Sequence, residues 1–238
     1  MHPRSAPPPL AEIRDVRVDY GDTRAVTDID LDIAAGALTV IVGANGSGKS
    51  TLIEVLAGVR TVTAGSVRVD ARARAFVPQR TAVAERLPLT VRDVVVVGAW
   101  GRVGPFRRLD PPARMAVDDA LRRLDIATLD RRPFSALSGG QRQRALLAQG
   151  LARGADLLLL DEPTTALDAA SAALIRRAIG EETARGTGVV CVSHDDRLIA
   201  EADVVVRMDA GRIVDQKSEQ KSEKPRSPEA AALLRGGE

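Results

Sequence analysis

The clearest structural signal in this sequence is the stretch Gly43-Ala44-Asn45-Gly46-Ser47-Gly48-Lys49-Ser50-Thr51. It fits the pattern G-x-x-x-x-G-K-[ST], in which glycines let successive backbone N–H groups curl around phosphate oxygens. An apolar run at 38–42 precedes it, and a helical pattern at Lys49–Ala57 follows and stops at Gly58. A helix that begins at the loop adds the positive potential of its N-terminus. The stretch therefore predicts a phosphate-binding loop between a buried strand and a helix, although a glycine-rich turn can match the pattern by chance.

The residues of this loop have distinct expected roles. Lys49 is expected to bridge the β- and γ-phosphates of a nucleotide, and Ser50 to hold Mg²⁺. The other residues expected to contact the nucleotide are Gly43, Asn45, Gly46, Ser47, Gly48 and Thr51.

A second signal is the run Leu157-Leu158-Leu159-Leu160-Asp161-Glu162-Pro163, an apolar strand that ends in two carboxylates. The end of a buried strand can place Asp161 on a metal ion, and Glu162 can then reach a water molecule beyond the γ-phosphate. Adjacent acids after a strand are otherwise common as a solvated turn. Beside a phosphate-binding loop the catalytic interpretation is favoured.

The third signal is Leu137-Ser138-Gly139-Gly140-Gln141. Ser138 is a good N-cap, so a capped helix start is one interpretation. It leaves unexplained why two glycines, which are unfavourable in helices, open the segment Gln141–Ala152. Exposed N–H groups at a helix start that bind a phosphate explain them.

Together the three signals resemble the nucleotide-binding subunits of ABC transporters. The resemblance covers about residues 16–214 and implies an ATPase that uses ATP and Mg²⁺. It implies an α/β fold: a P-loop NTPase core with a mostly parallel sheet, an N-terminal antiparallel β subdomain and an inserted α-helical subdomain. It also implies a head-to-tail homodimer in which each ATP lies between the phosphate loop of one subunit and Ser138, Gly139, Gly140 and Gln141 of the other.

Further positions match the family one by one. Tyr20, the only tyrosine, resembles the aromatic residue that stacks on adenine, although packing on the core is an equally open interpretation. Gln79 resembles the glutamine that senses Mg²⁺ and the attacking water, and Asp168 the aspartate that communicates across the dimer. His194 resembles the histidine that contacts the γ-phosphate. The expected catalytic set is Glu162, His194, Gln79 and Lys49, and the expected Mg²⁺ ligands are Ser50, Gln79 and Asp161.

One departure from the family pattern is the pair Gln149-Gly150, where arginine-alanine is more usual. This departure puts a local packing or charge contact of the family in doubt, but it does not affect any catalytic role.

The periodicity along the chain supports the implied fold. Alternating apolar residues at 16–20 and 29–33 predict half-buried antiparallel strands, and continuous apolar runs at 38–42, 156–160 and 188–192 predict central parallel strands. Residues 169–184 have a helical apolar stripe, and Asp110 followed by Pro111 predicts a helix start. The predicted organisation is a disordered leader at 1–10, a single ATPase domain at 11–215 with a helical subdomain at about 90–151, and a disordered tail at 216–238.

Composition bounds the classes of function. The 238 residues are 45% hydrophobic and 28% charged, with a net charge of +2, which is typical of a globular domain and predicts no nucleic-acid partner. The single cysteine, Cys191, excludes a disulfide within the chain and is expected to be a small buried residue in a strand. Prolines in the leader argue against a signal peptide, and the apolar runs are shorter than a bilayer span.

The resemblance also implies partners. These are integral membrane permease subunits, and indirectly an extracytoplasmic substrate-binding protein, with this chain peripheral on the cytoplasmic face of the cell membrane. The segment 90–109 is similar to the corresponding stretch in zinc and manganese uptake ATPases, which predicts divalent-metal import. Iron-chelate importers have a similar run and remain an alternative.

Soluble ABC ATPases of other classes fit the sequence less well. A DNA-repair ATPase would carry a long coiled coil between Gln79 and Leu137, and a translation-linked protein two cassettes in tandem. Glu162 and His194 argue against a regulatory protein that binds nucleotide without hydrolysing it.

Overall fold

The centre of the molecule is a six-stranded sheet in the order β5-β6-β7-β3-β8-β9. The computed structural model describes residues 8–79, 88–104 and 108–218. Neighbouring strands pair in parallel except at the β8–β9 edge, which is antiparallel. The strands are β3 (Leu38–Val42), β5 (Arg74–Val77), β6 (Leu157–Asp161), β7 (Gly188–Val192), β8 (Val204–Asp209) and β9 (Arg212–Ser218).

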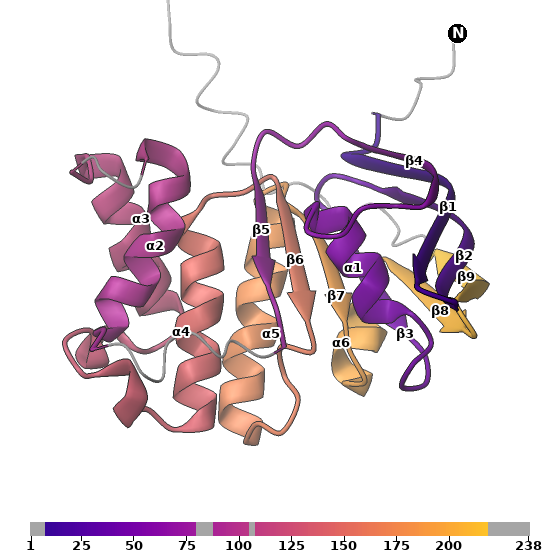
Figure 1. Ribbon diagram of the computed structural model, residues 1–238. Coiled ribbons are helices and arrows are strands. Elements are labelled where there is room, and N and C mark those ends of the chain that lie inside the picture. The colour runs from indigo at the N-terminus through magenta and orange to yellow at the C-terminus, as the bar shows by residue number, and fades with distance from the viewer. Residues whose placement is uncertain (1–7, 80–87, 105–107, 219–238) are drawn as a thin grey trace, which may run out of the picture.

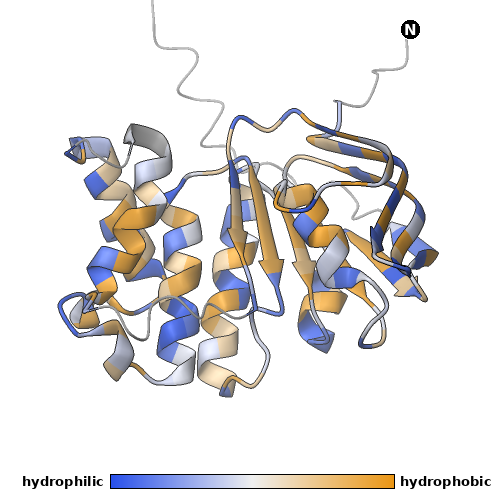
Figure 2. Cartoon of the chain, viewed as in Figure 1, coloured by the Kyte–Doolittle hydropathy of each residue, from blue (hydrophilic) through white to orange (hydrophobic). Residues whose placement is uncertain are grey.

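The central strands are buried on both faces, which is why their sequences are apolar without alternation. Along β6, Leu157 and Leu159 belong to one core cluster, and Leu158 and Leu160 to the other. Because side chains in a strand alternate between faces, the two clusters lie on opposite sides of the sheet. Figure 2 shows these strands as the most continuously hydrophobic part of the chain.

One face of the sheet is covered by helix α1 (Lys49–Ala57) and a small antiparallel sheet of order β2-β1-β4 (Figure 1). Its strands are β1 (Ala11–Tyr20), β2 (Thr23–Ile33) and β4 (Ala64–Val69). The antiparallel strands predicted at 16–20 and 29–33 are confirmed, and they pair with each other, with Val16 opposite Ile29.

The other face is covered by helices α5 (Ala169–Ala184) and α6 (Asp196–Glu201), which contribute to the second core cluster. The helices α2 (Val91–Val103), α3 (Pro111–Arg123) and α4 (Gly139–Ala152) form a group beyond the β5 edge of the sheet (Figure 1). Two short 3₁₀ turns, Ala127–Leu129 and Phe134–Ala136, connect α3 to α4.

Local sequence explains where these helices begin. The carboxylate of Asp110 accepts the N–H of Ala113 at 2.8 Å, and Pro111 stands at the first position of α3. Thr90 and Asp93 form a capping box at the start of α2. The α-helical insert expected at about residues 90–151 thus corresponds to α2, α3 and α4.

Two predicted boundaries need correction. The domain extends past residue 215, because Gln216, Lys217 and Ser218 complete β9 by pairing with β8. At the other end, Leu10 belongs to the small sheet rather than to a leader, since its N–H donates to Ile33 and its carbonyl accepts from Asp70. Residues 1–7 and 219–238, on which the rest of the leader and tail predictions fall, lie outside the described residues.

Cys191 is fully buried in β7, as predicted, and burial raises the pKa of its thiol. Within the described parts of the chain, none of the helices combines the length and apolar character that a bilayer span needs.

Candidate functional site

The loop between β3 and α1 has a backbone that only glycine supports at key positions. Gly48, which precedes α1, has φ 97°, and a Cβ there would lie 2.5 Å from the carbonyl oxygen of Ala25. Gly46 has φ 81° with open space around it. No side chain caps the first turn of α1. The backbone N–H groups of this turn are therefore available to phosphate oxygens, as phosphate binding requires.

Lys49 and Ser47 lie inside this loop. The Lys49 ammonium donates to the carbonyl oxygens of Gly43 at 2.9 Å and Ala44 at 2.8 Å, although the residue is only 5% exposed. The hydroxyl of Ser47 is buried and has no hydrogen-bond partner among the residues that the structure describes. A buried cation and an unpaired hydroxyl in one loop are groups that the oxygens of a polyphosphate can satisfy.

Ser50 and Asp161 approach each other where α1 meets the end of β6. The Ser50 hydroxyl donates to the Asp161 carboxylate at 3.4 Å. Burial raises the pKa of Asp161, and the hydrogen bond from Ser50 offsets this in part. A hydroxyl and a buried carboxylate form a hard oxygen donor set of the kind that Mg²⁺ prefers, so these residues fit the cation predicted for them.

Glu162 adopts a strained conformation beside them. Its φ is 50°, which is uncommon for a residue other than glycine. Its carboxylate accepts hydrogen bonds from the Gln79 amide at 2.6 Å and the Thr165 hydroxyl at 3.1 Å, and its N–H donates to the carbonyl of Val192. These contacts hold the carboxylate in one place, and such strain is typical of functional positions.

These groups line one cavity of about 460 Å³, a size suited to a nucleotide. Its lining comes from the start of β2, the phosphate loop, and the ends of β5 and β6. The residues are Thr23, Arg24, Ala25, Asn45, Gly46, Gly48, Lys49, Ser50, Thr51, Gln79 and Glu162.

Tyr20 lies at the rim of this region and is not a core residue. It is 42% exposed, and its hydroxyl is 3.4 Å from that of Thr51. The guanidinium of Arg60 lies 4.7 Å from the centre of its ring, and Glu54 holds that guanidinium through two hydrogen bonds. The exposure argues against the core-packing interpretation and leaves ring surface for a base.

His194 follows β7, at the sheet edge where Asp161 and Glu162 follow β6. In the register of these strands Val192 is opposite Asp161. Ser193 is 1% exposed and its N–H donates to Ile41, whereas His194 is exposed. The strand pairing therefore brings His194 to the same end of the sheet as the two carboxylates.

The third sequence signal, Leu137 to Gln141, is called the signature segment below, and it has a different environment. Ser138 and Gln141 form a reciprocal capping box, with the Gln141 N–H donating to the Ser138 hydroxyl and the Ser138 N–H to the Gln141 amide oxygen. The two glycines between them differ. A Cβ on Gly139 would meet nothing within 4 Å, whereas one on Gly140 would lie 2.7 Å from the hydroxyl of Ser171.

Asp168 caps α5 beside this segment. Its carboxylate accepts from the N–H and hydroxyl of Ser171 at 2.8 and 2.9 Å, and these hydrogen bonds lower the pKa of Asp168. The predicted site residues thus fall into two groups. Ser138, Gly139, Gly140, Gln141 and Asp168 do not line the cavity that holds Lys49 and Glu162.

Sequence reasoning missed several residues of the site. Thr23, Arg24 and Ala25 line the cavity from β2, and Thr165 holds Glu162. For Ala25 the only hint in the sequence is the glycine at position 48. Because Gly48 has no side chain, the Ala25 carbonyl can lie close to it. Gly150 packs so closely on Val77 that a Cβ there would lie 2.9 Å from it, which gives the departure from the family pattern a packing role.

Comparison with known proteins agrees with this geometry. A model of the ABC transporter family matches residues 26–165. The manganese transport system ATP-binding protein MntB of Listeria innocua is 35% identical over 195 residues, covering 79% of this chain and 81% of that protein. The hemin import ATP-binding protein HmuV of Streptomyces coelicolor is 39% identical over 230 residues, covering 88% and 81%.

Among solved structures, cbiO1 from Clostridium perfringens, part of the ABC transporter complex cbiONQ, is 26% identical with a TM-score of 0.73, and the match covers 89% of each chain. The family match extends from β2 through the carboxylates of β6 and so includes the phosphate loop and the signature segment. The chain belongs to the ABC transporter family, and it is an ATPase of that family's ATP-binding cassette fold.

Proposed function

We propose that this chain is the ATP-hydrolysing subunit of an ABC importer on the cytoplasmic face of the cell membrane, with a divalent metal ion, manganese or zinc, as cargo. The observation that carries the proposal is the position of Glu162, held by Gln79 at the edge of a cavity formed by a phosphate-binding loop. This arrangement suits hydrolysis of a nucleoside triphosphate at the γ-phosphate.

In the proposed mechanism Glu162 polarises the attacking water, and His194 and Gln79 assist in positioning it. Lys49 balances charge on the β- and γ-phosphates, and the N–H groups at the start of α1 add to its effect. Ser50, Asp161 and Gln79 would hold Mg²⁺, which supplies further charge neutralisation when bound. The preformed hydrogen bonds around Glu162 support this role, because positioning provides much of the acceleration in phosphoryl transfer.

We also propose that the working unit is a homodimer. The signature segment does not line the cavity of its own chain but exposes Gly139 at a helix N-terminus. A two-fold dimer, in which each signature segment closes the cavity of the partner, gives both anion sites one shared ligand. ATP would then form part of the interface, and its hydrolysis would weaken the contact.

A groove between β5 and the helical insert supports coupling to permease subunits. It has a volume of about 200 Å³, and its walls come from Phe76, Val77 and Pro78 on one side and from α2 and α4 on the other. Val97 and Trp100 of α2 are exposed, at 39% and 36%. The chain passes from this groove directly to Gln79, which bonds to Glu162, so movement at the groove has a short route to the catalytic carboxylate.

The cargo proposal depends on two observations. MntB, named for manganese transport, is 35% identical over 79% of this chain. The segment 90–109, which includes the start of α2 and the groove residue Val97, is the part of the sequence that resembles the metal uptake ATPases. An extracytoplasmic substrate-binding protein would deliver the metal to the permease and would not contact this chain.

The similarity to HmuV favours a second candidate, import of hemin or another iron chelate. That relative has the higher identity and the longer match, and no residue of this chain is expected to contact cargo in either case.

Uptake measurements separate the two candidates. Cells whose copy of this gene encodes Lys49→Ala would be compared with wild-type cells for accumulation of radiolabelled manganese, zinc and hemin in parallel. We expect loss of manganese or zinc uptake with normal hemin uptake. Loss of hemin uptake alone would replace the first candidate by the second, and unchanged uptake of all three would reject both.

A further inference from the structure

Helix α5 contacts two of the functional elements assigned above. Its N-cap, Asp168, and its first-turn residue Ser171 lie against Gly140 of the signature segment. One turn and a half further on, the Arg176 guanidinium donates to the Asp195 carboxylate at 2.8 Å. Asp195 follows His194 directly, so the same helix contacts the signature segment and residues 193–195, called the histidine loop below.

The Arg176–Asp195 pair is shielded from solvent. The side chains of Arg176 and Asp195 are only 11% and 16% exposed. Burial works to raise the pKa of Asp195, but the hydrogen bond from Arg176 and those from the N–H groups of Arg197 and Leu198 outweigh it, so the pKa is lowered. The carboxylate is therefore ionised near neutral pH and firmly held, unlike the exposed ion pairs on the surface.

The loop around His194 is fixed on both sides of the histidine. On one side, the Ser193 N–H donates to Ile41, and the Ser193 hydroxyl accepts the N–H of Asp195 at 3.0 Å. On the other, one oxygen of Asp195 caps α6 and the other accepts from Arg176. The exposed His194 side chain stands between these anchors, and Arg176 is the anchor that comes from α5.

From this geometry we infer that Arg176 is a positioning residue for the ATPase reaction: through Asp195 it sets the place of His194 relative to α5 and the signature segment. This inference rests on the role proposed above for His194. Removing the guanidinium leaves α6 capped but removes the hydrogen bond between α5 and the histidine loop. A small displacement of His194 is then enough to slow the reaction, because catalytic groups are sensitive to shifts of about 1 Å.

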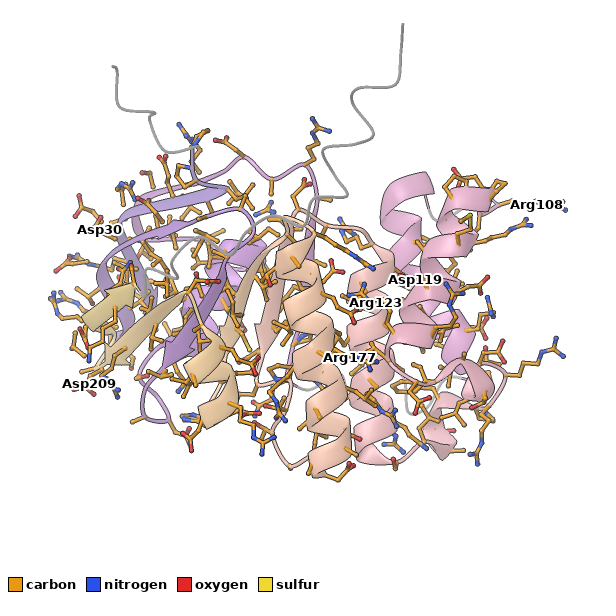
Figure 3. The ribbon with its side chains drawn as sticks, turned by 180° about the vertical axis from the view of Figure 1, so that it is seen from behind. Asp30, Arg108, Asp119, Arg123, Arg177 and Asp209 are labelled. Carbon is orange, nitrogen blue, oxygen red and sulfur yellow. The ribbon has the colours of Figure 1, made fainter. Side chains whose placement is uncertain are left out.

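The chain offers a matched control in the next residue, Arg177. Its side chain is 58% exposed and contacts Glu181 and the carbonyl of Arg123, on the side of α5 that faces α3. Figure 3 shows Arg177 beside Asp119 and Arg123, where α3 approaches α5. Arg177→Gln removes an arginine from the same helix turn without touching the histidine loop.

The experiment compares full-length wild type, Arg176→Gln and Arg177→Gln. For Arg176→Gln we expect kcat to fall by about 10- to 100-fold with the KM for ATP nearly unchanged, because the phosphate loop is intact. Arg177→Gln should retain kcat. Equal kcat values for the two variants would overturn the inference.

A spectroscopic measurement removes the dependence on activity. The sequence has two histidines, His2 and His194, so the imidazole ¹H–¹³C spectrum contains one resonance of interest, which His194→Gln assigns. Arg176→Gln should move or broaden that resonance and leave the His2 resonance in place, whereas Arg177→Gln should move neither. Superimposable His194 resonances in wild type and Arg176→Gln would also overturn the inference.

Two further variants distinguish a failure of this inference from a failure of the role proposed for His194. If Arg176→Gln does not fold, Arg176→Lys retains the charge and gives the same comparison, with kcat expected between those of wild type and His194→Gln. Wild-type kcat in His194→Gln would reject the proposed role of the histidine itself and with it the inference. A slow His194→Gln beside a fast, spectroscopically unchanged Arg176 variant would reject the inference alone.

Discussion

The N-termini of α1 and α4 are both proposed to bind phosphate, but they differ in what pairs with their backbone N–H groups. At α1 the preceding residue is Gly48 in a left-handed conformation, and no side chain caps the helix. At α4 the capping box pairs the N–H groups of Ser138 and Gln141 with side chains of the same chain. The first helix end opens on a cavity of about 460 Å³, and the second is exposed at Gly139.

This difference indicates that the two helix ends bind the nucleotide at different steps. The α1 end depends on its ligand and on the folded-back Lys49, so it is suited to bind nucleotide first. The α4 end is partly capped within its own chain, at the N–H groups of Ser138 and Gln141, so it can remain at the surface until another subunit presents a nucleotide. The same contrast predicts which substitutions act on binding within one chain and which act on assembly.

The largest effect is expected from Glu162→Gln. This variant tests whether the cavity at α1 binds ATP with one set of residues and hydrolyses it with another. The amide keeps the shape of the side chain but cannot take up a proton, so kcat should fall by about 10²- to 10⁴-fold while ATP still binds. Steady-state turnover and equilibrium binding measure the two effects. Because hydrolysis no longer releases the interface, light scattering with MgATP should show a dimer. Wild-type turnover in this variant would remove Glu162 from the role of base.

An intermediate effect is expected at the signature glycines. Gly139→Val adds a side chain in open space, so the melting temperature should stay near that of wild type while turnover falls at least about tenfold through lost phosphate contact. Gly140→Ala instead meets the Ser171 hydroxyl and should cost about 1–3 kcal/mol of stability, part of which Ser171→Ala restores. Thermal unfolding and ATPase assays together distinguish the two positions.

Mixing two inactive variants sharpens the same comparison. A heterodimer of Lys49→Ala and Gly139→Val contains one site in which both the phosphate loop and the signature segment are intact, but only if the two come from different subunits. ATPase activity should therefore reappear on mixing. A mixture as inactive as its components would contradict the shared site.

The last prediction is a small shift in stability, expected from Asp161→Asn. The pKa of Asp161 in the folded protein is raised above its unfolded value, chiefly by burial, so its contribution to stability is present at low pH and is lost as the pH rises through the folded pKa. At neutral pH the ionised carboxylate therefore destabilises the nucleotide-free protein. Asp161→Asn should raise its melting temperature by about 2–4 °C at pH 7, with no gain at pH 4, while ATPase activity is lost. A lower melting temperature at pH 7 would contradict the assignment.

Much of the site could be predicted because short segments carry it. The phosphate loop, the β6 carboxylates and the signature segment each have a local pattern, and the bounds of α1 and α5 agree with the periodicity of the sequence. The start of α3 was predictable from Asp110, since a cap is a contact between residues three apart. Such features depend on neighbours along the chain.

The remaining features depend on partners far apart in sequence. Arg60 covers Tyr20, Thr23 and Arg24 line the cavity, and Ser171 lies against Gly140. No period or motif reports these contacts, because they arise only after strands have paired and helices have packed. The correction at β9 has the same origin, since polar residues such as Gln216 and Lys217 form a strand only because β8 offers them a pairing edge.

The sequence alone thus determined the family, the residues proposed to bind phosphate, the carboxylates that follow the buried strand, and the positions of the glycines. Tertiary structure decided how these residues are grouped, with Lys49, Ser50 and Glu162 in one cavity and Ser138 to Gln141 outside it. It also placed Arg176 against Asp195. The physical reason is that hydrogen-bonding capacity and backbone freedom are properties of single residues, whereas burial, proximity and access to a partner exist only once the chain is packed.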